Sequence, residues 1–173
     1  MIPIDLVQRR IANISVGNST VRGQPKGTVA TARDYFASVD LAEFSRIINE
    51  DGFGKILDKH TKLLQKKLPS HSWGISRKVL NICLFQATHD ILLNKKYSLD
   101  AVIPYLELPL DNPNGKKLRK LARAEGIKLH WTNIKSLEPE MSAKLQAYAK
   151  KHARSEHQCE RCYLDVLWWR SDN

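Results

Sequence analysis

The chain has 173 residues, of which 42% are hydrophobic and 27% charged, values typical of one globular domain or of two small lobes that share a core. The formal net charge of +10 is the electrostatic footprint expected of a nucleic-acid-binding protein, although a basic surface can also serve solubility alone. No apolar run approaches the roughly 20 residues that span a bilayer, and residues 1–10 lack the apolar core of a signal peptide.

Hydrophobic residues recur at helical spacing along most of the chain and strand signals are sparse, so the fold is predicted to be mainly α. The expected helices cover residues 4–14, 28–38, 41–49, 53–68, 76–93, 116–124, 139–153 and 164–169. Asp40 is a predicted N-cap, and the Gly-rich segment 16–27 is predicted to form turns. We expect a single helical domain, residues 1–173, with one lobe from 1–50 and 140–173, the other from 51–139, and a cleft between them.

Two adjacent cations, Arg77 and Lys78, stand at the predicted start of the most apolar helix, after Pro69 and a loop that contains Gly74. Such a hairpin can present backbone N–H groups to a phosphate. The positive end of the helix dipole and the neighbouring Arg77 would both lower the pKa of Lys78, and a free amine can form a Schiff base. The position therefore suits phosphate contact or covalent catalysis, while a solvated lysine at a helix start is the ordinary alternative.

Asp111 lies 33 residues after Lys78, in a loop bracketed by Pro109 and Pro113. The prolines restrict the backbone of this loop, and Asp111 is positioned to cap the basic helix expected near Lys116. By itself the aspartate indicates a turn or a cap. Next to a free lysine amine it also suits charge stabilisation or proton transfer.

Three motifs occur in order: Lys78–Ile82 opens a long apolar helix, Leu108–Asp111 forms a proline-containing loop, and Tyr163–Trp169 ends the chain's last helix. In these motifs, which span roughly the C-terminal 60% of the sequence, the chain resembles the helix-hairpin-helix DNA glycosylases. Within that superfamily it is most similar to the archaeal-type 8-oxoguanine DNA glycosylase/AP lyases. The resemblance implies a glycosylase-like helical bundle that acts in base-excision repair on double-stranded DNA with a damaged base.

The resemblance also implies a mechanism. Lys78 would attack C1′ of a nucleotide extruded from the duplex, and an oxidised purine such as 8-oxoguanine would leave. Asp111 would stabilise charge on the opening sugar and orient or deprotonate the lysine. The resulting Schiff base would permit strand cleavage by β-elimination, which is the AP lyase activity.

Four residues are implied to bind the flipped base. Trp169 would stack on it and Asp165, four residues earlier, would hydrogen-bond its edge; burial of Trp169 in the core is the alternative. Ile82 stands where the family often has an aromatic residue. Ser19, with Gln24 close by, stands nearest to the position where the family carries a base-reading glutamine.

Contacts with the DNA backbone are expected from the hairpin and from the start of the basic helix after Asp111. The residues concerned are Trp73, Gly74, Ser76, Arg77, Lys116 and Lys117. For Trp73, packing of the loop is the alternative. A non-catalytic DNA-binding module on the same scaffold, and an interaction protein whose charge is incidental, remain open as functions.

The pair Cys159 and Cys162, with His152 and His157 nearby, resembles half of a zinc site. The chain contains three cysteines, so it lacks a second pair and cannot supply the four ligands of an iron–sulfur cluster. Three cysteines also suit a reducing compartment better than a disulfide framework. We therefore expect no metal or other cofactor. We also expect a monomer that is cytoplasmic and nucleoid-associated and that does not contact a membrane.

Overall fold

The computed structural model describes residues 2–46 and 49–169, and every regular element in these residues is a helix. The prediction of a mainly α fold is confirmed. The elements up to residue 105 are α1 (Ile4–Ser15), α2 (Thr28–Ala37), α3 (Ala42–Ser45), α4 (Glu50–Lys67), α5 (Trp73–His89), α6 (Ile91–Tyr97) and the 3₁₀ helix η1 (Leu99–Tyr105). The later elements are α7 (Asn112–Ala124), η2 (Ile134–Ser136), α8 (Pro139–His157), η3 (Arg161–Tyr163) and α9 (Leu164–Trp168). Within the described residues, no helix combines the length and apolarity needed to cross a membrane.

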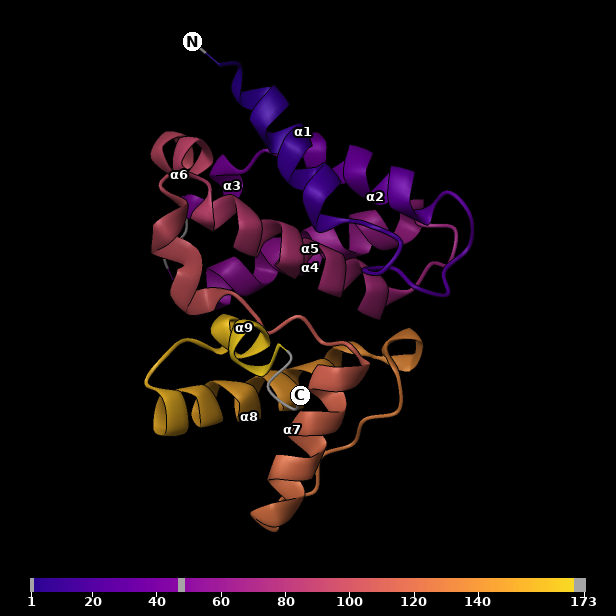
Figure 1. The fold of residues 1–173 in the computed structure, drawn as a ribbon, viewed down its shortest axis with the longest axis vertical. Coiled ribbons are helices and arrows are strands. Elements are labelled where there is room, and N and C mark those ends of the chain that lie inside the picture. Colours follow the sequence, from indigo (N-terminus) through magenta and orange to yellow (C-terminus); the bar gives the residue numbers. More distant parts are fainter. Residues whose placement is uncertain (1, 47–48, 170–173) are drawn as a thin grey trace.

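The hydrophobic side chains form two clusters, which follow the two groups of helices in Figure 1. The first cluster joins α1–α6 around α5, which packs against both α1 and α4. The second joins α7, α8 and α9, and takes in Trp73 from the start of α5. The predicted lobes differ from this arrangement: α1, α2 and α3 pack with α4 and α5 in the first cluster, whereas α8 and α9 belong to the second, because the apolar stripe of α1 is covered by α5.

The central helix α5 is buried on most of its surface, which is why its sequence is apolar on several faces. It begins at Trp73, three residues before the predicted start, with Ser72 as its N-cap. It ends at His89 instead of continuing to residue 93, because the Asp90 carboxylate caps the separate helix α6. The earlier start has a consequence for the site: Lys78 lies in the second turn of α5, not in the first.

The start of α7 is fixed by Asp111, whose Oδ1 accepts a hydrogen bond of 3.0 Å from the backbone N–H of Asn114. The predicted capping role of Asp111 is confirmed, although α7 begins at Asn112 rather than near Lys116. Gly115 lies against the indole of Trp131, and a Cβ at this position would overlap the ring. The first turn of α7 is therefore held by a cap and by close packing.

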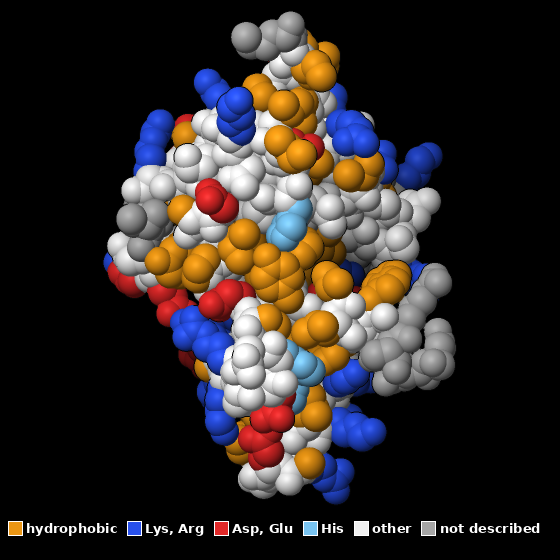
Figure 2. Space-filling model, turned by 60° about the vertical axis from the view of Figure 1, so that its left-hand side comes forward, with side chains coloured by type: hydrophobic (Ala, Val, Ile, Leu, Met, Phe, Trp, Pro, Cys, Tyr) orange, Lys and Arg blue, Asp and Glu red, His pale blue; other side chains and the backbone are white. Residues whose placement is uncertain are grey.

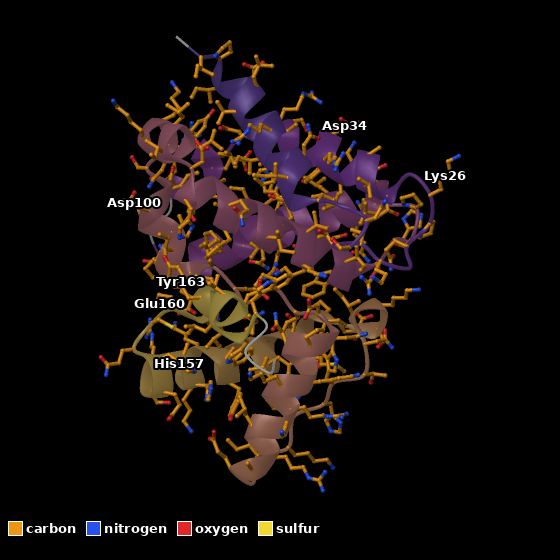
Figure 3. The ribbon with its side chains drawn as sticks, viewed as in Figure 1. Lys26, Asp34, Asp100, His157, Glu160 and Tyr163 are labelled. Atoms are coloured by element: carbon orange, nitrogen blue, oxygen red, sulfur yellow. The ribbon has the colours of Figure 1, made fainter. Side chains whose placement is uncertain are left out.

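The segment 16–27 between α1 and α2 forms turns, as predicted, with Gly23 at φ 72° and Gly27 at φ 93°. Such left-handed backbone favours glycine. Lys26 projects from this loop away from the body of the protein (Figure 3). The predicted helix 41–49 is shorter than expected, because α3 ends at Ser45; its residues 47–48 lie outside the described part of the chain.

Candidate functional site

The side chains of Lys78 and Asp111 meet where α5 approaches the start of α7. Lys78 Nζ lies 3.8 Å from Asp111 Oδ2, and the two side chains are 11% and 30% exposed. Lys78 Nζ also donates a hydrogen bond of 3.0 Å to the carbonyl oxygen of Thr20 in the turn segment 16–27. Three segments far apart in the sequence therefore meet at one amine.

Burial lowers the pKa of the Lys78 ammonium, and the carboxylates of Asp111 and Asp165 act in the opposite direction. The predicted direction is confirmed, but its cause differs from the expected one. The helix dipole acts within the first turn, whereas Lys78 lies in the second. The cation that adds to the lowering is Arg22 rather than Arg77.

Asp165 joins this pair through Asn114, a residue that sequence reasoning did not identify. Asn114 Nδ2 donates hydrogen bonds to Asp165 Oδ1 at 2.6 Å and to the carbonyl oxygen of Pro109 at 2.9 Å. Burial raises the pKa of the Asp165 carboxyl, and the Asn114 hydrogen bond opposes that rise. The sequence does contain one indication of this role: Asn114 stands three residues after the cap Asp111, a position from which a side chain can reach back toward the preceding loop.

The remaining predicted base-binding residues, Ile82, Ser19 and Trp169, do not share one cavity with the lysine. Ile82 is half-buried one turn after Lys78, and Ser19 is exposed at a hollow of about 800 Å³ in the segment 16–33. Gln24 also lines this hollow, and neither of its buried amide atoms has a hydrogen-bond partner among the described residues. Trp169 is 70% exposed, so it is not a core residue.

One gap beside Lys78 is closed to solvent. Side chains of α5, the loop before α7 and α8 enclose a gap that is too small to hold a water molecule. The contact of Lys78 with Asp111 and the charge of Asp165 lie outside this gap, since neither aspartate lines it; Ser19 and Trp169 do not line it either.

The predicted DNA contacts in the hairpin are wrong for Trp73, Gly74 and Ser76. Trp73 is 8% exposed and belongs to the second hydrophobic cluster, while Ser76 is fully buried and donates its hydroxyl to the Ser72 carbonyl. Gly74 lies against the backbone carbonyl of Ile134, where a Cβ would collide. Because α5 begins earlier than predicted, these residues form its buried first turns instead of an exposed loop.

The prediction of a phosphate contact by Arg77 is also wrong. Its guanidinium forms a bidentate pair with Glu107, with two N–O distances of 2.7 Å, and a third contact of 2.6 Å with Asp58 Oδ1. The Arg77 side chain is 10% exposed. Burial opposes the charge of Glu107, but the Arg77 guanidinium holds the pKa of that carboxyl below its usual range. Arg77 is therefore part of a buried ionic network.

The two lysines at the start of α7 differ in environment. Lys116 is exposed, whereas Lys117 is half-buried with Nζ 5.2 Å from the ring centroid of Trp168. That distance is typical of a cation–π contact.

On the face drawn in Figure 2, hydrophobic side chains gather across the middle, and Lys and Arg side chains lie toward both ends.

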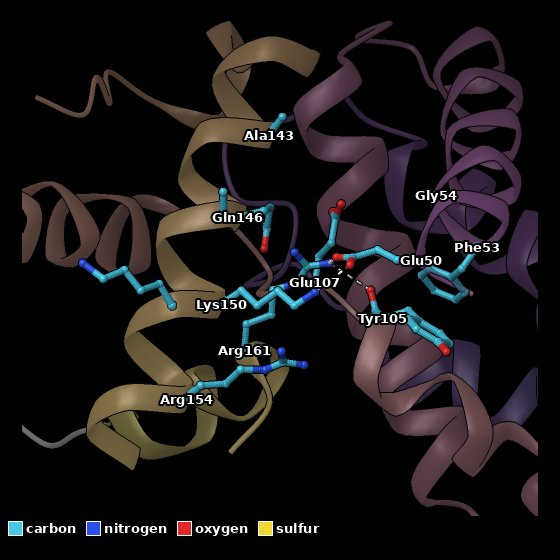
Figure 4. Close-up of a pocket in the computed structure, with 12 residues that line it drawn as sticks. Glu50, Phe53, Gly54, Tyr105, Glu107, Ala143, Gln146, Lys150, Arg154 and Arg161 are labelled. Carbon is cyan, nitrogen blue, oxygen red and sulfur yellow. Dashed lines mark hydrogen bonds and ion pairs between the residues drawn. The ribbon is translucent and has the colours of Figure 1, made fainter. Parts of the chain in front are cut away.

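A cavity of about 520 Å³ lies between the two groups of helices, with cations of α8 on one wall (Figure 4). Lys150 Nζ pairs with Glu50 at 2.6 Å, and Arg161 donates to the carbonyl oxygens of Tyr105 and Leu106 at 3.0 Å each. Arg154 pairs with Glu160. These cations therefore already have partners within the chain. The contacts of Lys150 and Arg161 join the two groups of helices across the cavity.

Cys159 and Cys162 are free thiols, and Cys162 is buried. Burial raises the pKa of Cys162 to about 12, which keeps it a thiol rather than the thiolate that binds metals. Among residues 2–46 and 49–169, no group of three or more His, Cys, Asp or Glu side chains is arranged to hold a metal ion.

Comparison of the chain with family models, curated proteins and solved structures found no match. The function proposed below therefore depends on the geometry around Lys78 and on the three sequence motifs.

Proposed function

We propose that the chain is a bifunctional DNA glycosylase/AP lyase of the helix-hairpin-helix class that removes an oxidised purine from double-stranded DNA. One observation carries the proposal: Lys78 Nζ lies 3.8 Å from Asp111 Oδ2. A half-buried lysine with a lowered pKa beside a carboxylate is the arrangement that amine nucleophiles need. The order Lys78, Asp111, Asp165 is also the order of the family's motifs.

In the proposed reaction the neutral Nζ of Lys78 attacks C1′ of a flipped nucleotide, and the bond from C1′ to the base breaks. The base leaves with the electron pair of that bond and takes up a proton. The bond between C1′ and O4′ then opens, which gives a protonated Schiff base between C1′ and Nζ. Asp111 accepts the ammonium proton before attack and gives that proton to the departing base, which restores the carboxylate. One proton of the new C1′–Nζ ammonium moves to O4′ as the sugar opens, and the Asp111 carboxylate then stabilises the positive charge of the Schiff base.

Strand cleavage follows by β-elimination. A base removes a proton from C2′, the 3′ phosphate leaves, and water later releases the sugar from Nζ. Attack also requires Nζ to give up its hydrogen bond to the Thr20 carbonyl. Trp169 is 70% exposed, and an exposed indole suits stacking on a base, an interaction worth about 1–3 kcal/mol.

A non-catalytic module that binds duplex DNA is the second candidate. The observation that favours it is the enclosed space beside Lys78, which has no room for a base in this conformation. Such a module would bind DNA in a salt-sensitive manner without cleaving it, and loss of Asp111 would leave that binding unchanged.

Borohydride trapping separates the two candidates. The hydride reduces the C=N bond of the Schiff base and leaves the protein covalently attached to DNA that carries 8-oxoguanine or an abasic site. We expect trapping by the native chain, none by Lys78→Ala, and native trapping by the control Lys96→Ala, which changes an exposed lysine of α6. If K78A traps as well as the native chain, or if the native chain binds but never traps, the glycosylase proposal fails.

A further inference from the structure

A second hollow, of about 830 Å³, lies between α7 and the segment that follows it. Its lining is strongly basic and contains no acidic residue: Lys116, Arg119, Lys120, Arg123, Gly126, Ile127, Lys128 and Leu129. All five cations are exposed, and Ile127 and Leu129 supply an apolar part of the lining. Here five positive charges surround one open depression.

None of these five cations forms an ion pair with a described residue, and the one hydrogen bond found for them joins Arg119 Nη1 to the carbonyl oxygen of Trp131 at 3.2 Å. The cations in Figure 4 differ, since Lys150 and Arg154 each pair with a glutamate. Like charges four residues apart on a helix, such as Lys116 and Lys120, repel one another. Among residues 2–46 and 49–169, no carboxylate therefore pairs with the cations of this hollow.

The spacing of the cations fits an extended polyanion better than a single small anion. From Lys116 to Arg123 the helix rises roughly 10 Å, at about 1.5 Å per residue. One DNA strand carries a phosphate about every 3.4 Å along the duplex axis, so this helix face is as long as about three phosphate-to-phosphate spacings. Lys120 lies between Lys116 and Arg123 in the sequence, so the three cations form a row along one face of α7.

We propose that this hollow binds the sugar–phosphate backbone of duplex DNA as a contact site separate from Lys78. The choice of DNA as the polyanion rests on the proposed function, but binding here needs no chemistry at Lys78. Because α7 begins at the cap Asp111, Lys116 follows that residue by roughly 7 Å of helix. From its start, α7 runs away from the helices α1–α6 (Figure 1), so its later cations lie farther from the Lys78–Asp111 pair. Lys117, which lies over Trp168, is not part of the row.

Fluorescence anisotropy with a short, undamaged, labelled duplex tests the proposal over a range of about 50 to 200 mM salt. The variant K116Q/K120Q removes two cations of the hollow, and K95Q/K96Q removes two exposed cations of α6 as a matched control. Each lost phosphate contact lowers the slope of log K against log salt by about 1. We expect a loss of about 2 in slope for K116Q/K120Q and no change in slope for the control.

Equal losses in both variants would mean that binding follows net charge alone, and would overturn the proposal. Unchanged duplex binding by K116Q/K120Q, or binding of that row to anionic lipid vesicles instead of duplex, would overturn it as well. The outcome is distinguishable from a failure of the proposed enzyme, because an undamaged duplex reports no chemistry. If trapping at Lys78 fails while the slope falls as expected, DNA binding at the hollow is supported and the proposed enzyme activity is not. If trapping succeeds while the slope of K116Q/K120Q is unchanged, only the proposed DNA contact at the hollow is overturned. Circular dichroism of both variants verifies that each is folded.

Discussion

Lys78 Nζ and Asp111 Oδ2 lie 3.8 Å apart although 33 residues separate them in the chain, while the other oxygen of Asp111 caps α7. One carboxylate therefore acts on both the fold and the candidate site. The two roles are separable, because asparagine keeps the capping oxygen but carries no charge.

Asp111→Asn should preserve the start of α7 and impair the chemistry. Asn and Asp are similar N-caps, whereas Asp111→Ala removes the cap, so we expect the free energy of unfolding of D111A to lie about 1 kcal/mol below that of D111N. Borohydride trapping should be strongly slowed in both, since both lack the carboxylate beside Lys78. Chemical denaturation and trapping rates measure the two effects, and native trapping by D111N would reduce Asp111 to a helix cap.

The sequence could predict Lys78 and Asp111 because each is marked by a local pattern, a lysine before an apolar run and an aspartate between prolines. The contact between them depends on tertiary packing and cannot be predicted from their spacing in the sequence. Asn114 was missed because its role depends on a bond to Asp165, which comes from α9. The packing of the helices, and not the sequence motifs, thus brings the side chains of the candidate site together.

The hairpin was mispredicted for a related reason. Gly74 looks like a turn residue in the sequence, and Ser76 like a helix start, but the cap is Ser72. Glycine at 74 is explained by the close approach of the Ile134 backbone, which follows 60 residues later. The division into lobes failed in the same way, since an amphipathic pattern shows that a helix has a buried face but not which helix covers it.

Arg77→Met should destabilise the chain strongly, because it leaves the buried Glu107 carboxylate without its bidentate partner. Breaking a buried pair from one side costs about 3–5 kcal/mol. The control Arg154→Met breaks an exposed pair and should cost no more than about 1 kcal/mol. Denaturant unfolding measures both, and comparable losses would show that the Arg77 network contributes no more than a surface pair.

A second variant sharpens that test. Glu107→Leu in the Arg77→Met background removes the carboxylate that R77M orphans, so the double variant should regain most of the lost free energy. If R77M/E107L is as unstable as R77M, the loss arises from packing of the arginine stem rather than from an unpaired buried charge.

Stability should fall in mild acid because of His60, which is buried beside Tyr35 and Glu43. Burial lowers the pKa of His60, against the opposing effect of Glu43. As pH drops below the unfolded-state pKa of 6.5, the unfolded chain binds a proton that folded His60 does not. The free energy of unfolding then falls by up to about 1.4 kcal/mol per pH unit until the folded pKa is reached.

Denaturation of the native chain and of His60→Gln at about pH 7.5 and pH 5.5 measures this contribution. The difference in unfolding free energy between the two pH values should be smaller in H60Q, while His130→Gln, which changes an exposed histidine, should behave like the native chain. An unchanged pH dependence in H60Q would assign the acid sensitivity to other groups.

Gly74→Ala should be destabilising although it places a better helix former in α5. The new Cβ would meet the Ile134 carbonyl and would lie 2.9 Å from Leu137 Cβ, and a backbone atom cannot move aside as a side-chain tip can. Overpacking of this kind costs about 1–3 kcal/mol. Gly54→Ala in α4 is the matched control: its Cβ meets no atom within 4 Å, so it should gain about 0.5–1 kcal/mol. If thermal or denaturant unfolding finds G74A as stable as G54A, α5 and η2 are not in close contact at Gly74.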